Sequence, residues 1–386
     1  MPGDGIGNTV LPESFRVLTA TGFEYETVHA DIGWECWCNQ GNPLPQRTLD
    51  LLEEHRVGLF GAITSKPPRD ANAELADHLK DTGLVYYSPI VGLRQHFNLD
   101  VCIRPCRSFK NNPLNFIKRG ADDEIVEPPV DAVIFRQNTE GLYAGVEWTN
   151  PPVDVRSALE THKKMANFKS VLSEDLAIST RIFSRAACQR ILREAFEYAK
   201  RFGYGSVTVC EKPNVIRETS GMMLSEGQLI QKDYPNIPLW NTNIDAQMMW
   251  LTKNPEEYGV LVSGNMFGDI VSDGFAGLVG GLGFAASANL GKTCAVFEPT
   301  HGSAPKYADY EVPIVNPIAM VLSMCMMLDY MDEIETANKI RDAIGRVIAE
   351  GKVRTYDMMR VPGRQSVLDE GSASTTEMTD AIIAAL

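Results

Sequence analysis

Two aspartates, Asp269 and Asp273, stand four residues apart shortly after an apolar run at residues 258–263. If the chain becomes helical after Gly268, their carboxylates lie on one face of the helix, one turn apart. Two carboxylates in this arrangement suit a hard divalent cation such as Mg²⁺ or Mn²⁺, whose ligand shell waters and a substrate can complete. A helix N-terminus that favours acidic residues near its dipole explains the same pair equally well.

Three arginines, Arg94, Arg104 and Arg136, each stand beside an apolar segment that we expect to form a helix or a strand. A single arginine in such a place is more often a solvated or paired surface charge than part of a site. Three of them suggest a pocket for a polycarboxylate, because the guanidinium group matches a carboxylate in bidentate fashion.

Other polar residues follow the apolar runs at 205–210 and 57–63. Lys212, which stands before a proline, is a candidate proton-transfer group if burial or neighbouring charges lower its pKa. Asp245 provides a third acid ahead of a methionine-rich helix. Thr64 lies where open α/β sheets place ligands, at the carboxyl end of a strand, although a capping and turn cluster explains it about as well.

Composition excludes some classes of function. A net charge of -14 over 386 residues argues against a general nucleic-acid or anionic-membrane surface, because either would need a basic footprint. The length favours two domains. The eight cysteines are scattered without zinc-ligand spacing, which indicates reduced thiols in the cytoplasm. We see no apolar run of membrane-spanning length and no signal-peptide pattern.

The elements that must position these residues can be placed from periodicity. Expected strands occupy 23–30, 57–63, 99–107, 205–210 and 258–263, and expected helices occupy 10–20, 45–55, 174–202, 316–328, 332–350 and 375–385. Residues 149–175 lack clean periodicity and could pack against a partner chain. The glycines at positions 3, 5 and 7 do not form the dinucleotide fingerprint, because the third comes one place early and no strand precedes them. A tight turn that leads into a helix is favoured there over a nucleotide-phosphate site.

Taken in order, these residues closely resemble the β-decarboxylating dehydrogenases, the family of isocitrate, isopropylmalate and homoisocitrate dehydrogenases. The segments 136–145 and 268–273 are the most specific motifs, and the resemblance runs from Pro2 to the C-terminal helix. It implies an α/β fold of the isopropylmalate dehydrogenase type with two domains. Residues 1–99 and 280–386 would form the large, nucleotide-binding domain. Residues 100–279 would form the small domain for dimerisation, metal and substrate, with a clasp at about 149–185.

The resemblance also implies roles for the chemical residues. Asp245, Asp269 and Asp273 would hold Mg²⁺ or Mn²⁺, Lys212 would be the base for the hydroxyl proton, and Tyr143 the acid that protonates the enolate. Arg94, Arg104 and Arg136 would bind the two carboxylates that all the malate-type substrates share. Family members are homodimers with shared active sites, so Lys212 and Asp245 would come from the partner subunit.

For the nucleotide, the resemblance places the nicotinamide near Thr64 and Glu298, and the adenosine against the loop that begins at His301. The predicted cofactor-binding residues are Thr64, Glu298, His301, Gly302, Lys306, Tyr307, Asn316, Tyr356 and Arg360. The last group of Lys306, Tyr307, Tyr356 and Arg360 matches the pattern of NADP-dependent isocitrate dehydrogenase, and its cations suit a 2′-phosphate. We therefore predict NADP, with NAD as the alternative.

The residues predicted to bind the substrate's variable group do not indicate the same substrate as the other motifs. Ser88 is the serine that isocitrate enzymes have, but Ile90 stands where they have asparagine, and this helix is closer to that of homoisocitrate enzymes. Isocitrate is the expected substrate, and homoisocitrate or another 3-substituted malate, including an unusual anionic analogue, is the alternative. A reading from another class is a regulatory subunit without catalysis, against which the intact Lys212 and Tyr143 argue. The family's first strand would precede Pro2, so either the start of the sequence is misassigned or that strand is lost.

Overall fold

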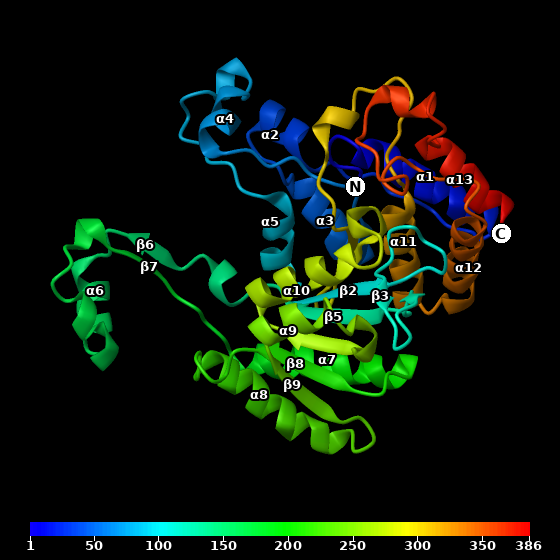
Figure 1. The fold of residues 1–386 in the computed structure, drawn as a ribbon. Coiled ribbons are helices and arrows are strands. Elements are labelled where there is room, and N and C mark those ends of the chain that lie inside the picture. Colours follow the sequence, from blue (N-terminus) through cyan, green and yellow to red (C-terminus); the bar gives the residue numbers. More distant parts are fainter.

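An eight-stranded mixed sheet forms the centre of the chain, with helices on both faces (Figure 1). The computed structural model describes residues 1–386, except for the side chain of Pro68. The strand order is β1-β12-β11-β2-β5-β10-β8-β9. This arrangement confirms the α/β class expected from the sequence.

The strands are short and the helices are of ordinary length. The strands are β1 Val57–Leu59, β2 Val101–Arg107, β3 Lys118–Arg119, β4 Ile125–Val126, β5 Asp131–Gln137, β6 Glu147–Thr149, β7 Ala177–Ser179, β8 Val207–Glu211, β9 Leu239–Asn243, β10 Val260–Ser263, β11 Ala286–Leu290 and β12 Ala295–Pro299. The helices are α1 Gly7–Ala20, α2 Trp34–Gln40, α3 Gln46–His55, α4 Pro68–Ala73, α5 Pro89–His96, α6 Val153–Glu160, α7 Arg185–Phe202, α8 Thr219–Ile230, α9 Ile244–Trp250, α10 Asn265–Gly277, α11 Ile318–Tyr330, α12 Ile334–Glu350 and α13 Thr375–Ala384. No helix of the described residues is long and apolar enough to cross a membrane.

Strand direction changes in the middle of the sheet. Strands β5, β10, β8 and β9 are mutually parallel, whereas β2 is antiparallel to both of its neighbours, β5 and β11. The boundary predicted between the two domains falls between β11 and β2, which are paired through Ala288 and Ile103. Whether the two halves behave as separate domains stays a prediction.

Alternate residues of the central strands pack against different helices. Val133 and Phe135 of β5 belong to the core cluster that includes α7, whereas Ala132 and Ile134 belong to the cluster that includes α10. Because successive strand side chains point to opposite faces, α7 and α10 cover opposite faces of the same sheet. The residues of β2 and β5 that face α10 are therefore the ones that can meet its acids.

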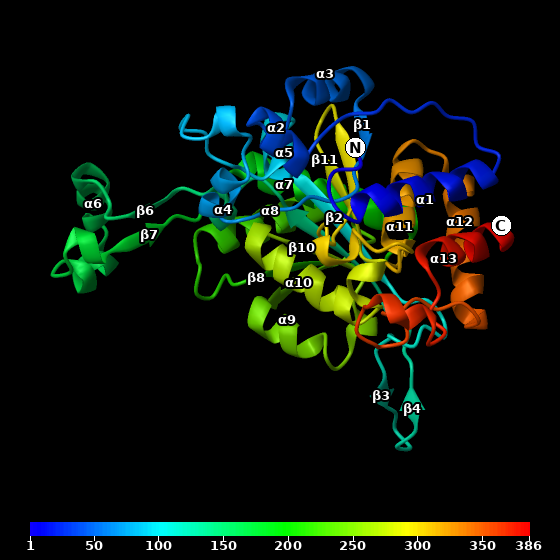
Figure 2. The same ribbon diagram turned by 90° about the horizontal axis from the view of Figure 1, so that it is seen from above.

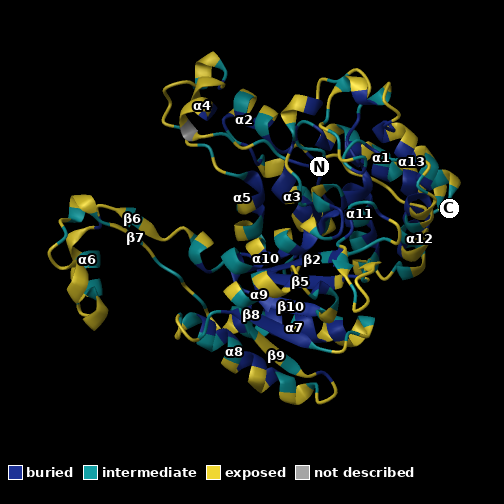
Figure 3. Ribbon diagram, viewed as in Figure 1, coloured by how far each residue is buried: buried dark blue, intermediate teal, exposed yellow. Residues whose placement is uncertain are grey.

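Residues 146–183, called the arm below, extend away from the body of the protein (Figures 1 and 2). The arm consists of the antiparallel pair β6–β7 with α6 and short 3₁₀ turns beyond it. None of the residues of α6 is buried, and Figure 3 shows most of the arm as exposed or half-buried. The arm thus covers nearly all of the predicted clasp at about 149–185, and its contact with a second chain stays a prediction.

Two expected elements are wrong. Residues 23–30 form no strand, since alternation alone does not supply a neighbouring strand with which to hydrogen-bond. The helix expected over 174–202 begins only at Arg185. Ser184 caps it by accepting a hydrogen bond from the Ala187 N–H, and the Glu140 carboxylate in turn binds Ser184. This cap separates the helix from β7, which the periodicity of the sequence did not resolve.

Candidate active site

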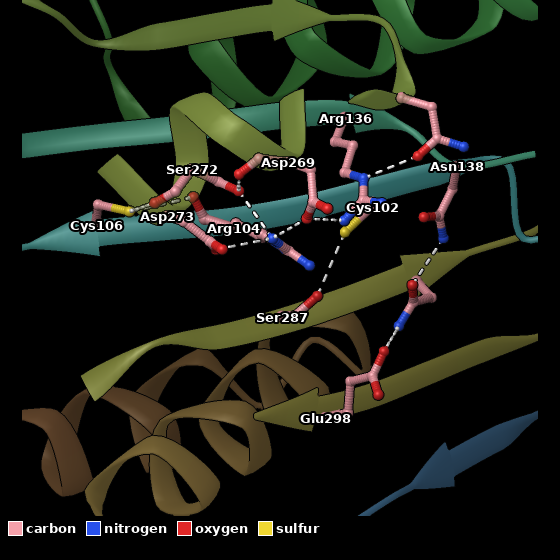
Figure 4. Close-up of polar contacts among 12 residues, drawn as sticks. Cys102, Arg104, Cys106, Arg136, Asn138, Asp269, Ser272, Asp273, Ser287 and Glu298 are labelled. Atoms are coloured by element: carbon pink, nitrogen blue, oxygen red, sulfur yellow. Dashed lines mark hydrogen bonds and ion pairs between the residues drawn. The ribbon is translucent and has the colours of Figure 1, made fainter. Parts of the chain in front are cut away.

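The two acids of α10 lie on one face of that helix, as expected, and both contact arginine. Asp269 Oδ1 accepts a hydrogen bond from Arg104 Nη1 at 2.9 Å and another from Arg136 Nη1. Asp273 Oδ1 lies 3.3 Å from Arg104 Nη1. We call these four residues the acid–arginine cluster (Figure 4). In this cluster, residues far apart in the sequence lie together at one site.

The arginines of the cluster come from adjacent strands. In the β2–β5 pair, Cys102 is opposite Arg136 and Arg104 is opposite Ile134, so both guanidinium groups emerge on the face that α10 covers. A side chain at Gly268 would place its Cβ only 2.8 Å from Arg136 Cβ. Glycine at this position therefore lets α10 approach the strand closely enough for Asp269 to reach both arginines.

A third arginine reaches the same region from α5. Arg94 Nη2 is 3.1 Å from Glu298 Oε1, and Arg94 Nε donates to Asn289 Oδ1 at 3.1 Å. Burial lowers the pKa of Arg136, and the positive charges of Arg104 and Arg94 lower it further. The three predicted arginines are thus close enough to repel one another, and an anionic substrate would relieve that repulsion.

One buried amide, Asn289, binds Arg94 and a second, Asn138, binds Asn289; sequence reasoning missed both. Asn138 Nδ2 donates to Asn289 Oδ1 at 2.8 Å, and Asn289 Nδ2 donates to Glu298 Oε1 at 2.8 Å. Asn289 is fully buried in β11. The signal that could have found it is a single amide inside an otherwise small and apolar strand, since a buried amide requires partners.

Tyr143 lies near the cluster, on a 3₁₀ turn at Leu142–Ala144 that follows β5. The Arg136 guanidinium carbon lies 5.7 Å from the centre of its ring. The turn starts after Gly141, whose φ of 84° requires glycine. Half of the Tyr143 surface is exposed, so its hydroxyl group is accessible to a bound molecule.

Lys212 and Asp245 contact each other and lie on elements at the far edge of the sheet. Lys212 follows β8 and donates to the Asp245 carboxylate at the start of α9, which lowers the pKa of Asp245. No hydrogen bond or ion pair joins them to the acids of α10 within the described chain. No three His, Cys, Asp or Glu side chains of the described residues are grouped closely enough to hold a metal ion. One chain alone therefore presents Asp269 and Asp273, but not the complete set of three acids.

The two α10 carboxylates nonetheless fit a divalent cation. Mg²⁺ is commonly bound by one or two protein carboxylates together with waters and substrate oxygens. Asp269 and Asp273 are 31% and 61% exposed, whereas the side chains of Arg104 and Arg136 beneath them are 11% and 5% exposed. The acids are therefore the members of the cluster that a cation can reach from solvent.

The N-terminal turn is a scaffold for the loop predicted to hold the nucleotide. Asp4 accepts hydrogen bonds from the backbone N–H groups of Trp34 at 2.7 Å and of Thr64 at 2.8 Å. The Thr64 and Ser303 hydroxyl oxygens are 2.6 Å apart, and Ile6 N–H donates to the Ser303 carbonyl. These bonds connect three segments distant in sequence, which explains the glycine-rich turn without a phosphate.

The remaining predicted nucleotide residues form two groups. Lys306 Nζ lies 4.5 Å from the centre of the Tyr307 ring, and the Tyr307 and Tyr356 rings are 5.6 Å apart. Asn316, by contrast, donates to Asp357, and Arg360 donates to the Pro113 carbonyl. The structure thus brings together Lys306, Tyr307 and Tyr356, while the contacts of Asn316 and Arg360 lie with other residues.

His301 has an open hydrogen-bonding position. Its Nδ1 lies 3.1 Å from the Gly302 carbonyl oxygen, and its Nε2 is buried without a hydrogen-bond partner among the described residues. Burial lowers the pKa of His301, which keeps the ring neutral. His301 Nε2 is therefore a buried ring nitrogen that no side chain or backbone group of the described residues satisfies.

The residues predicted to bind the substrate's variable group lie at the start of α5. Ser88 precedes the first turn and is half-buried. Ile90 is 9% exposed and belongs to a core cluster with Leu93 and Leu99. Its packing role is therefore clear, and contact with a substrate stays a prediction.

A cavity of about 1520 Å³ lies on the other face of the same strands. Its lining includes Ile103 and Pro105 of β2 and Ala288 of β11. These residues alternate with Arg104 and Asn289, so the cavity and the polar site lie on opposite faces of the sheet. The candidate active site is the polar face.

Comparison with known proteins identifies the family. The family model described as isocitrate/isopropylmalate dehydrogenase matches residues 1–382. The chain belongs to this family. Its members are β-decarboxylating dehydrogenases of hydroxyacids, which agrees with the resemblance seen in the sequence.

Individual relatives differ in their named substrates. Homoisocitrate dehydrogenase of Methanocaldococcus jannaschii is 38% identical over 91% of this chain and 90% of its own. The crystal structure of isocitrate dehydrogenase from Methylococcus capsulatus has a TM-score of 0.80 and 34% identity, covering 100% of this chain and 97% of that one. Protein DlpA of Legionella pneumophila is 36% identical over 99% of this chain, which spans 57% of the DlpA length.

The close approach at Gly268 leads to a first prediction. We expect Gly268→Ala to lower the free energy of unfolding by about 1–3 kcal/mol, because the new methyl group forces α10 away from β5. Gly277→Ala is the matched control in the same helix, since a Cβ there meets no atom within 4 Å. Denaturant unfolding of both variants measures the difference, and equal stabilities would show that Gly268 does not set the helix–strand distance.

The buried ring of His301 leads to a second prediction. Because folding lowers the pKa of His301, the unfolded chain takes up its proton more readily, so stability falls as pH drops below the ordinary histidine value of about 6.5. We expect His301→Gln to reduce the loss of Tm between pH 7.5 and 5.5 in protein without nucleotide. The exposed His55→Gln serves as the control. An unchanged pH dependence in the His301 variant would contradict the prediction.

Proposed function

We propose that the protein catalyses the oxidative decarboxylation of isocitrate, with hydride transfer to NADP and assistance from Mg²⁺ or Mn²⁺. The observation that carries this proposal is the convergence of Arg94, Arg104 and Arg136 beside the exposed acids of α10. Isocitrate brings several carboxylates and a hydroxyl group, which are the ligands that three guanidinium groups and a hard cation recognise.

The arginines would bind the two carboxylates nearest the reacting carbon. Within the single chain, Asp269 and Asp273 neutralise Arg104 and Arg136, and Glu298 neutralises Arg94. A cation bound to the acids would compete for the same carboxylate oxygens and leave the guanidinium donors for the substrate. Fixing both carboxylates orients the hydroxyl-bearing carbon toward the nicotinamide and reduces the entropic part of the barrier.

Asp269 and Asp273, with Asp245 of the partner subunit, would hold the metal ion. When bound, the metal supplies Lewis-acid stabilisation of the negative charge that develops on the substrate oxygen. Lys212 of the partner subunit, as the neutral amine, would accept the hydroxyl proton. Its ion pair with Asp245 keeps the two groups together at the end of β8. Tyr143 would deliver a proton to the enolate that remains after loss of CO₂.

A homodimer would complete this site. Large apolar side chains are exposed on the elements around Lys212 and Asp245, with Trp240 61% exposed on β9 and Met249 46% exposed on α9. The arm exposes Val153 and Leu172 at 81% and 61%. Exposed apolar groups concentrated on these elements favour burial against a second copy, which would also supply Lys212 and Asp245.

NADP is supported by the chemistry of the loop at 301–307. Lys306 is exposed and stacked against Tyr307, whose ring packs against Tyr356. A lysine ammonium group held in this way suits the additional phosphate of NADP, and Arg360, which donates to the Pro113 carbonyl, would add a second cation. Thr64 and Glu298 would lie beside the nicotinamide, which would supply the hydride acceptor.

Homoisocitrate is the second candidate substrate, favoured by Ile90 and by the helix in which it lies. Ile90 offers no hydrogen-bond donor for the third carboxylate of isocitrate, so that group would depend on Ser88. The relative from Methanocaldococcus jannaschii is named for homoisocitrate. An apolar wall at this point tolerates a longer substrate arm better than a polar one would.

The substrate and cofactor can be assigned together. Purified protein with Mn²⁺ is assayed with isocitrate, homoisocitrate and isopropylmalate, each with NADP⁺ and NAD⁺, by following reduced nicotinamide. We expect kcat/KM for isocitrate with NADP⁺ to exceed each other combination by roughly tenfold or more. A preference for homoisocitrate or NAD⁺ would overturn that part of the assignment, and no turnover with any pair would favour a regulatory subunit without catalysis.

Replacement of one acid tests the metal site. We expect Asp273→Asn to weaken Mn²⁺-dependent substrate binding by on the order of 100-fold or more, because a ligand charge is lost. Tm should not fall, since burial already raises the pKa of Asp273 and makes its charge unfavourable. Asp332→Asn, an exposed acid paired with Arg201 on the cavity side, is the control. Unchanged Mn²⁺ dependence in the Asp273 variant would rule out this metal site.

A further inference from the structure

A buried ion pair lies at the root of the arm. Arg181, two residues beyond β7, donates through Nη2 to Glu211 Oε2 at 2.8 Å. Glu211 is the last residue of β8 and is fully buried, while the Arg181 side chain is 13% exposed. We call Arg181 and Glu211 the root ion pair. None of the site residues predicted from the sequence belongs to it.

The root ion pair is fully provided with partners. Glu211 Oε2 also accepts from Ser220 Oγ at 2.6 Å, and Arg181 Nη1 donates to the same hydroxyl at 2.9 Å. The guanidinium carbon of Arg181 lies 4.5 Å from the ring centre of Phe183 and 4.9 Å from that of Phe267. Stacking between two rings and forked donation are geometries that arginine provides and lysine does not.

Glu211 connects two elements of the proposed active site. It directly precedes Lys212, whose N–H donates to Ser220 at 3.3 Å. Its other oxygen, Oε1, accepts from the Gly264 N–H at 2.7 Å, at the residue that directly precedes α10. A Cβ at Gly264 would lie 2.6 Å from Phe183 and 2.8 Å from Glu211. Glycine is thus needed for this contact. One carboxylate therefore binds the residue before α10 directly and the backbone of Lys212 through the Ser220 hydroxyl.

We propose that Arg181 and Glu211 are positioning residues that align Lys212 and α10 with respect to the arm. This inference rests on the proposed function, in which Lys212 acts in the partner's site and the α10 acids act in the chain's own site. The root ion pair then joins two active sites of a dimer through one chain. A buried ion pair adds little to stability on balance, which favours a role in geometry.

Hybrid dimers can separate the two effects. One subunit carries Lys212→Met and the other Asp273→Asn, on different affinity tags, so that tandem purification yields dimers with a single intact site. That site uses the acids of the first subunit and the lysine of the second. Arg181→Lys is then added to either subunit, and Arg156→Lys serves as the control. Arg156 is an arm arginine of similar exposure, 15%, with a 2.8 Å bond to Glu160.

The two placements have different expected results. In the lysine-donating subunit, Arg181→Lys should lower kcat on the order of 10- to 100-fold with KM for the substrate within about twofold, because only the proton-transfer group is misplaced. In the acid-donating subunit, it should raise the Mn²⁺ concentration needed for half-maximal activity. Arg156→Lys should change neither quantity, and Tm of each hybrid shows whether it is folded.

Failure of the inference is distinguishable from failure of the proposed function. If the hybrid without an Arg181 change has no activity while the unmodified dimer is active, sites are not shared, and both the shared-site part of the proposed function and the inference are wrong. If that hybrid is active and Arg181→Lys changes only Tm, or changes the same kinetic quantity equally in either subunit, the root ion pair is merely structural and the inference alone is wrong.

Discussion

The site depends on one carboxylate, that of Asp269, shared by two arginines on adjacent strands. This contact fixes α10 against β2 and β5 and places both acids of the helix above a layer of positive charge. The guanidinium groups are buried and the acids are partly exposed, so the anionic oxygens are directed toward solvent. A cation can approach from that side without displacing any part of the fold. The buried arginines keep their positions because strands, which deform little, carry them.

Strand alternation determines which residues can join the site. Arg104 on β2 and Asn289 on β11 point to the face that holds α10, whereas Ile103 and Ala288 point to the cavity on the opposite face. A shift of one residue in either strand would exchange the two sets. The β2–β11 pairing is therefore a requirement of the chemistry as well as of the fold. It also explains why a large cavity adjoins these strands without containing any of the predicted catalytic groups.

The sequence alone predicted the positions of residues whose spacing determines where they lie on a helix or strand. The four-residue interval placed Asp269 and Asp273 on one helix face, and the apolar segments beside Arg104 and Arg136 proved to be the strands β2 and β5. It was not sufficient for residues that act through partners distant in the chain. Nothing local in Asn289 or Glu211 indicates what each one contacts, because a buried polar group is defined by its surroundings. The false strand at 23–30 has the same cause, since a strand needs a partner that no local pattern specifies.

Charge explains why a site divided between two chains would suit this chemistry. In one chain, the acid–arginine cluster carries two negative and two positive charges, so it attracts a divalent cation only weakly. Asp245 of a partner subunit would add one negative charge, and a substrate's carboxylates would occupy the arginines that now neutralise Asp269 and Asp273. Metal and substrate would then each increase the affinity for the other, because each removes the charge that opposes the other. The arginines that make the isolated cluster a poor metal site are thus the groups that would make the metal–substrate complex a good ligand.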